Sequence, residues 1–132
     1  MTTRYLGLLD GGDGAYGIAF PDAPGCTAMG KTIDEAIANA ASALAEWASR
    51  EGAPAARTAA EMKADPDVVE QLEGGSAFVV VPLIAESGRS VRANLSIDAG
   101  LLAAIDEAAN AVRLTRSAFL ASAARAKILS GV

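Results

Sequence analysis

The chain has 132 residues, of which 16 are acidic and 11 basic, and its net charge at pH 7 is −5. It contains no histidine and a single cysteine, Cys26, which excludes a histidine-based triad and an internal disulfide. The first apolar run is interrupted by Asp10 and no run reaches the roughly 18 apolar residues of a membrane span. We therefore expect a cytoplasmic protein of one or two small domains, without a signal peptide.

Three short strands and a long helix are predicted for the first 52 residues. Residues 5–9 and 15–20 flank a glycine-rich turn and are expected to form a hairpin, and residues 26–29 follow a proline-containing turn as a third strand. Thr32 and Glu35 have the spacing of a capping box that opens a helix. Its apolar stripe ends before Gly52 and comprises Ile33, Ala36, Ile37, Ala40, Leu44, Trp47 and Ala48.

A fourth strand completes this first domain. Residues 53–76 are polar and rich in alanine, and they are expected to hold one or two short helices around Glu61 and residues 68–72. Residues 77–84 are nearly all apolar, so we expect a strand in the centre of the sheet. The order strand, strand, strand, helix, strand predicts a small α+β domain over residues 1–85, followed by a hinge.

Residues 91–97 alternate strictly between apolar and polar side chains, which is typical of a strand with one buried face. Its polar face carries Arg92, Asn94 and Ser96. Only helical patterns follow, so the strand has no partner left in its own chain, and we expect it to pair antiparallel with a second copy across a two-fold axis. A two-stranded ribbon fits the DNA major groove, and these polar residue types read base edges.

Two amphipathic helices are predicted after this strand. Asp98 opens the first, which continues to Val112, and Thr115 caps the second after a short break. The free amides of a helix N-terminus attract a phosphate group. Thr115, Arg116 and Ser117 are therefore candidate contacts to the DNA backbone.

Charge divides unevenly along the chain. Residues 1–85 hold five basic and twelve acidic residues, net −7, whereas residues 86–132 hold six basic and four acidic residues, net +2. An acidic half is a poor ligand for nucleic acid but a good one for a basic protein, although solubility explains the same charge equally well. The weakly basic half needs dimerisation to accumulate phosphate contacts.

Two patterns suggest enzymes, and neither is complete. Residues 25–32 match the nucleotide-binding string G-x-x-x-x-G-K-T, but prolines stand where its preceding strand should run and Thr32 already serves as a helix cap. Two-metal hydrolysis needs three or four converging carboxylates, whereas Asp13 and Asp22 fall in turns and Asp34 and Glu35 in a helix's first turn. We expect no enzymatic activity, no metal and no cofactor. The carboxylates in question are Asp10, Asp13, Asp22, Asp34 and Glu35.

The second half resembles the ribbon-helix-helix repressors. The matching segments are Val-Arg-Ala-Asn-Leu-Ser-Ile-Asp (91–98), Leu-Leu-Ala-Ala-Ile-Asp-Glu-Ala-Ala (101–109) and Leu-Thr-Arg-Ser-Ala-Phe-Leu (114–120). The resemblance implies base contacts by Arg92, Asn94 and Ser96 and phosphate contacts by Thr115, Arg116 and Ser117. This sequence departs from the family pattern at Asp98, where proline is common, and at Arg113, where glycine is common.

The first half resembles the N-terminal domain of HicB-type antitoxins. The similarity is carried by Asp-Gly-Ala-Tyr-Gly-Ile-Ala-Phe-Pro-Asp-Ala-Pro-Gly-Cys (13–26) and continues through residues 30–44. It implies an α+β fold of two parts: a partial RNase-H-like domain over residues 1–85 without nuclease activity, and a dimerising ribbon-helix-helix domain over residues 86–132.

This second resemblance also implies partners. The antitoxin would cover the active surface of a small basic HicA-type mRNA-cleaving toxin and repress its own operon at operator DNA. We expect toxin contacts at Asp10, Asp13, Tyr16 and Asp22, and a homodimer through the C-terminal ribbon, with pairing into tetramers left open. The alternative is a free-standing ribbon-helix-helix regulator whose first half binds a ligand or another protein.

Overall fold

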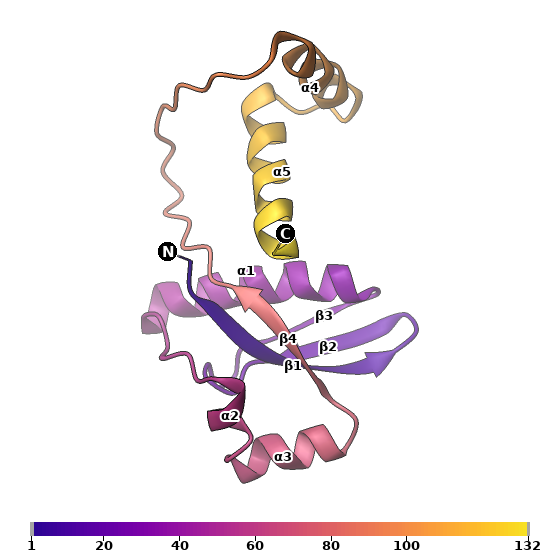
Figure 1. Ribbon diagram of the computed structural model, residues 1–132, viewed down its shortest axis with the longest axis vertical. Helices are drawn as coiled ribbons and strands as arrows, with labels where there is room; N and C mark the ends of the chain where they lie inside the picture. The colour runs from indigo at the N-terminus through magenta and orange to yellow at the C-terminus, as the bar shows by residue number, and fades with distance from the viewer. Residues whose placement is uncertain (1, 132) are drawn as a thin grey trace. The chain divides into compact units, whose positions relative to one another are not determined.

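The computed structural model describes residues 2–131, and the chain divides into two compact units, Met1–Ser87 and Gly88–Val132. None of the helices in this described part is long and apolar enough to cross a membrane. The first unit contains, in chain order, β1 (Arg4–Gly12), β2 (Ala15–Ala19), β3 (Thr27–Gly30), α1 (Ile33–Glu51), α2 (Ala59–Met62), α3 (Pro66–Glu73) and β4 (Ala77–Pro82), as labelled in Figure 1. The second unit contains α4 (Ala99–Ala111) and α5 (Arg116–Ser130).

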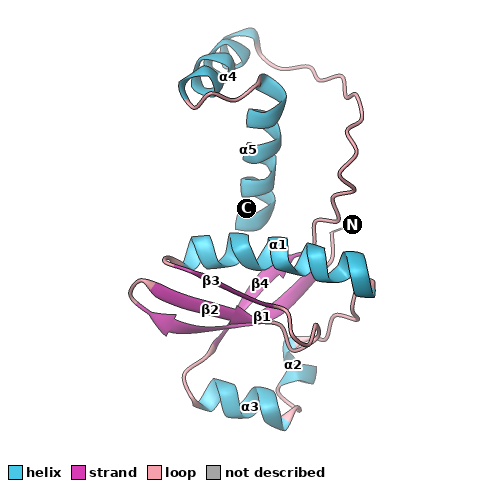
Figure 2. Cartoon of the chain, turned by 180° about the vertical axis from the view of Figure 1, so that it is seen from behind, coloured by secondary structure: helices cyan, strands magenta, loops and turns pink. Residues whose placement is uncertain are grey.

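The four strands form one antiparallel sheet in the order β3-β2-β1-β4. Figure 2 shows α1 on one face of this sheet and α2 and α3 on the other. The predicted hairpin and the short helices around Glu61 and residues 68–72 are present. The α+β architecture expected from the sequence is thereby confirmed.

The position of β4 corrects one prediction. Residues 77–84 were expected to form a central strand, but β4 pairs only with β1 and lies at the edge of the sheet. Its apolar composition has another cause, because layers cover part of each face: Val81 is fully buried on one side, and Phe78 packs against the cluster beneath α2 and α3 on the other, where Val80 stays 51% exposed. Apolar residues on both faces of a strand therefore indicate that other elements pack against those faces. They do not indicate that the strand has a hydrogen-bonded neighbour on each edge.

Helix α1 packs closely against the end of β3. Ala36, Ala40 and Leu44 of its predicted stripe are buried, Ala48 is half-buried, and Ile33 at its start is 42% exposed. A Cβ atom placed on Gly30 would lie 2.4 Å from the backbone nitrogen of Ala36, so only glycine permits this approach. Thr32 caps α1 as predicted, but the Glu35 carboxylate accepts from the N–H of Lys31 at 3.3 Å rather than from Thr32. The capping box is therefore displaced by one residue.

The second unit has very little interior of its own. Only Ile105 and Ala109, both in α4, are buried among its described residues. Residues 91–97 form no strand in the single chain, because a strand requires the ladder hydrogen bonds of a neighbour. The strand was predicted to pair with a second copy, so it stays a prediction for the dimer. The large apolar side chains that remain exposed are Val91, Leu95, Leu101, Val112, Leu114 and Ile128.

Arg113 carries a local strain that a substitution should relieve. It lies between α4 and α5 with φ of +58°, a conformation that costs a residue with a Cβ about 1–2 kcal/mol. We expect Arg113→Gly to raise the free energy of unfolding by about 0.5–1 kcal/mol, since glycine loses part of this gain to its unfolded-state entropy. Urea titration measures the change. The control Ala104→Gly, at an exposed position in the interior of helix α4, should lower stability by about 1 kcal/mol. A lower free energy of unfolding for both variants would show that the backbone at Arg113 is not strained.

Candidate functional site

The three side chains predicted to read bases lie in the extended segment before α4. Arg92, Asn94 and Ser96 are all exposed. The apolar residues that alternate with them are equally uncovered, with Val91 77% and Leu95 68% exposed. The amphipathic pattern of this segment is therefore present, but nothing in the described chain covers its apolar face.

The start of α5 shows how its three candidate phosphate contacts are arranged. The Thr115 hydroxyl accepts from the N–H of Ala118 at 3.1 Å and caps the helix. Arg116 donates through Nε to Asp106 Oδ1 at 2.8 Å and through Nη2 to Asp106 Oδ2 at 2.7 Å. This bond lowers the pKa of Asp106 and raises that of Arg116. Two of the five guanidinium N–H donors are engaged, so three remain for another acceptor.

Part of the segment and the start of α5 share one hollow of about 540 Å³. Ser96 lies in its wall together with Arg116 and Ser117, and apolar residues supply most of the rest. The structure thus brings one predicted base reader close to two predicted phosphate contacts. Asp106 was missed by sequence reasoning, because no local spacing signals a pair that spans the turn between two helices.

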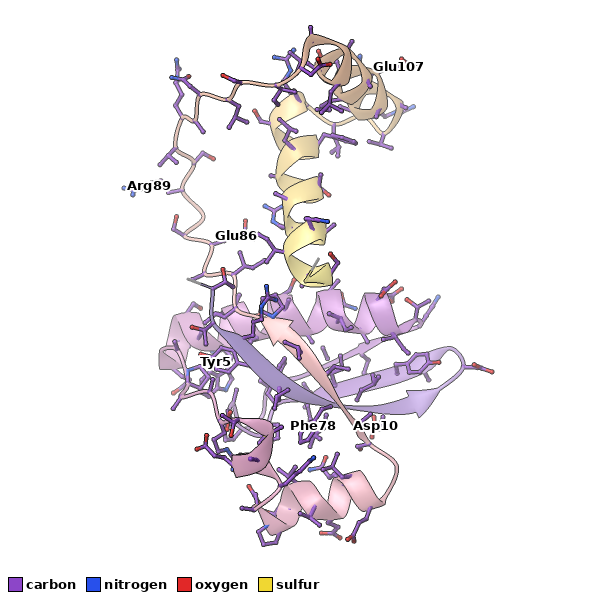
Figure 3. All side chains as sticks on the ribbon, in the orientation of Figure 1. Tyr5, Asp10, Phe78, Glu86, Arg89 and Glu107 are labelled. Atoms are coloured by element: carbon purple, nitrogen blue, oxygen red, sulfur yellow. The ribbon has the colours of Figure 1, made fainter. Side chains whose placement is uncertain are left out.

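The four residues predicted to contact a toxin do not lie on one surface. Asp13 and Tyr16 line a hollow of about 380 Å³ between the β1–β2 turn and the start of α1, together with Lys31 and Asp34. Asp10 lies on the opposite face of the sheet, on the side of Phe78, α2 and α3, as Figure 3 shows. The first unit therefore offers two separate candidate surfaces.

Asp22 belongs to neither surface, because an internal ion network binds its carboxylate. Arg57 donates to Asp22 through Nε at 2.6 Å and through its backbone N–H at 2.8 Å, and through Nη1 to Asp65 at 3.1 Å. The side chain of Asp22 is only 6% exposed. The hydrogen bond to Asp22 raises the pKa of Arg57, and the bond from Arg57 lowers the pKa of Asp65. This arrangement anchors the segment between α1 and α2, so Asp22 has a structural role.

The nucleotide-binding string has a structural explanation. Residues 27–30, which would have to wrap a phosphate, form strand β3 and pair with β2. The Thr32 hydroxyl accepts from the N–H of Glu35 at 3.0 Å, and Gly30 is required by the approach of α1.

Burial raises the pKa of the Cys26 thiol. Within residues 2–131, no three His, Cys, Asp or Glu side chains are grouped to hold a metal ion.

Comparisons with known proteins agree over nearly the whole chain. A family model described as HicB-like antitoxin of bacterial toxin–antitoxin systems matches residues 6–124. The crystal structure of the antitoxin HicB of Burkholderia pseudomallei is 30% identical with a TM-score of 0.51, covering 92% of this chain and 96% of that one. The crystal structure of antitoxin HicB3 is 29% identical with a TM-score of 0.51, covering 96% and 98%. Among curated proteins, no sequence matches significantly.

Proposed function

Because the chain belongs to the HicB-like antitoxin family of bacterial toxin–antitoxin systems, we propose that it neutralises a HicA-type mRNA-cleaving toxin and represses its own operon at operator DNA. The observation that carries this proposal is the extent of the family match, residues 6–124, which includes parts of both compact units. The proposed action is non-enzymatic: the protein covers a surface of the toxin and binds DNA. Residues 1–85 are the proposed toxin-binding domain, and residues 86–132 are the proposed DNA-binding domain.

Charge supports toxin binding by the first domain. Its net charge of −7 favours encounter with a basic protein and disfavours direct contact with nucleic acid. Asp10, Asp13 and Tyr16 lie on surfaces with room for a partner. Asp10 on one surface, and Asp13 with Tyr16 on the other, are therefore the proposed alternatives for the toxin contacts, and Asp22 is assigned to the ion network described above.

Exposed apolar side chains support dimerisation through the second domain. Monomeric soluble proteins rarely expose a contiguous apolar surface of large extent, and this domain buries few of its own apolar residues. Pairing of residues 91–97 between two copies covers Val91 and Leu95 and completes the missing ladder. The resulting ribbon presents Arg92, Asn94 and Ser96 twice, with Thr115, Arg116 and Ser117 as phosphate contacts beside it.

This arrangement predicts that polar substitutions on the apolar face of the ribbon dissociate the dimer. We expect Val91→Ser with Leu95→Ser to convert the full chain to a monomer, because each replaced side chain removes about 1.5–3 kcal/mol of burial and the dimer is affected twice. Light scattering coupled to size-exclusion chromatography measures the mass. The control Arg92→Ala with Asn94→Ala changes the polar face and should remain dimeric. A serine variant that keeps the dimeric mass would place the main interface elsewhere.

One experiment tests the proposed function directly. The full chain is co-expressed with the protein encoded by the neighbouring gene, the complex is purified, and cleavage of RNA is measured with and without the antitoxin. A tight complex that suppresses cleavage is the expected result. Specific DNA binding without any complex would instead favour the free-standing regulator, with a ligand or another protein bound by its first domain.

A further inference from the structure

One face of the sheet in the first unit is only half covered. Helices α2 and α3 cover the part formed by β1 and β4, where Leu6, Leu8 and Phe78 pack against Met62 and Val68. On β2 and β3 the same face is formed by small or exposed side chains, and Met29 is 68% exposed. This leaves a groove of about 330 Å³ beside α3. We call it the sheet groove; its lining includes Leu8, Asp10, Gly17, Ala19, Met29 and Gln71.

Asp10 lies across the floor of this groove. It is paired in register with Gly17 of β2, and a Cβ atom placed on Gly17 would lie only 3.0 Å from Asp10 Oδ1. The carboxylate therefore occupies the space that the missing side chain leaves. No lysine or arginine within residues 2–131 forms an ion pair with it.

We propose that the sheet groove is the docking site of the toxin, with a lysine or arginine of the toxin paired to Asp10 and an apolar side chain of the toxin packed against Met29. The inference rests on the proposed function and specifies its surface. Charge complementarity supports this occupant, because an uncompensated carboxylate in a domain of net charge −7 (residues 1–85) complements a basic partner. The hollow at Asp13 and Tyr16 is a weaker candidate, because Lys31 in its wall offsets part of the negative charge of Asp13 and Asp34.

The proposal is tested by reversing single charges in the full chain. Asp10→Lys, Asp13→Lys and the control Glu51→Lys change the net charge equally at three exposed positions of the first unit, and Glu51 lies at the end of α1 away from both surfaces. Isothermal titration with the purified protein of the neighbouring gene measures Kd. We expect Asp10→Lys to raise Kd by about 100-fold or more, and the other two substitutions to raise it at least tenfold less.

A second variant fills the groove without changing its charge. Thr27 is an exposed residue of β3 that also lines the groove, and Thr27→Trp suits a strand while blocking the floor. We expect this variant to weaken toxin binding comparably to Asp10→Lys, with the thermal unfolding midpoint retained. It keeps the test valid if the lysine variant fails to fold.

The outcomes distinguish failure of the sheet groove from failure of the proposed function. Loss of binding confined to Asp10→Lys and Thr27→Trp supports the sheet groove. An equal loss for all three lysine variants, or the largest loss for Asp13→Lys, overturns it while toxin binding itself stands. Absence of any complex with the unaltered chain contradicts the proposed function, and the inference fails with it.

Discussion

Replacement of Arg92 and Asn94 together by alanine is expected to abolish sequence-specific binding of operator DNA while the protein remains dimeric. In a paired ribbon the double substitution removes four base-reading side chains, and each good bidentate contact contributes about 1–3 kcal/mol of discrimination. Specific binding generally exceeds non-specific binding by at least about 10³-fold. The variant should therefore bind its own promoter region no more tightly than a scrambled duplex of the same length.

Fluorescence anisotropy at fixed salt, with both duplexes, measures this discrimination. Arg116→Ala is the informative comparison, because a phosphate contact carries no sequence information. We expect it to weaken binding to both duplexes alike and to reduce the slope of log K against log salt by about one for each phosphate that is no longer neutralised. Unaltered discrimination by the Arg92 and Asn94 variant would show that the ribbon does not read the bases.

Arg57→Ala is expected to lower the free energy of unfolding of the first unit by about 2–4 kcal/mol. The side chain of Asp22 is only 6% exposed, and removal of one partner of a buried pair leaves an uncompensated charge. The matched control is Arg50→Ala, which breaks a pair with Glu46 in which both side chains are more than 60% exposed. Such a surface pair contributes only about 0–1 kcal/mol.

The single tryptophan, Trp47, lies in α1 and makes the measurement specific to the first unit. Urea titration followed by its fluorescence gives the free energy of unfolding of each variant. Equal stability of Arg57→Ala and Arg50→Ala would show that the network does not anchor the segment between α1 and α2. The comparison separates a buried ion network from an exposed ion pair with the same type of substitution.

At acid pH, the difference in the free energy of unfolding between the unaltered chain and Arg57→Ala should become smaller. The hydrogen bond from Arg57 lowers the pKa of Asp65 in the folded state. The stability that this bond supplies is fully present above the pKa of an unfolded aspartate, about 3.9, and is lost as the pH falls through the lower folded value. The stabilities of the two proteins should therefore converge below about pH 4.

Local sequence patterns specified the elements of the fold well. Glycine-rich turns located the β1–β2 hairpin, Thr32 and Thr115 marked helix starts, and period-two alternation identified residues 91–97 as an amphipathic segment. These features depend on side chains within a few positions of one another, so a single sequence contains them. The motif at residues 13–26 likewise identified the antitoxin family, which the family match confirms.

The candidate surfaces could not be predicted from local sequence patterns, because they are formed by contacts between residues far apart in the chain. Asp22 pairs with Arg57 at a separation of 35 residues, and Arg116 pairs with Asp106 across the turn between two helices. The sheet register places Asp10 over Gly17, and the layers on both faces explain an apolar strand at the edge. Side chains that are close together in the chain were enough to predict the elements, their helix caps and the family. Strand order, ion pairing and the division of the acidic residues between two surfaces follow from packing between distant segments, so no local pattern contains them.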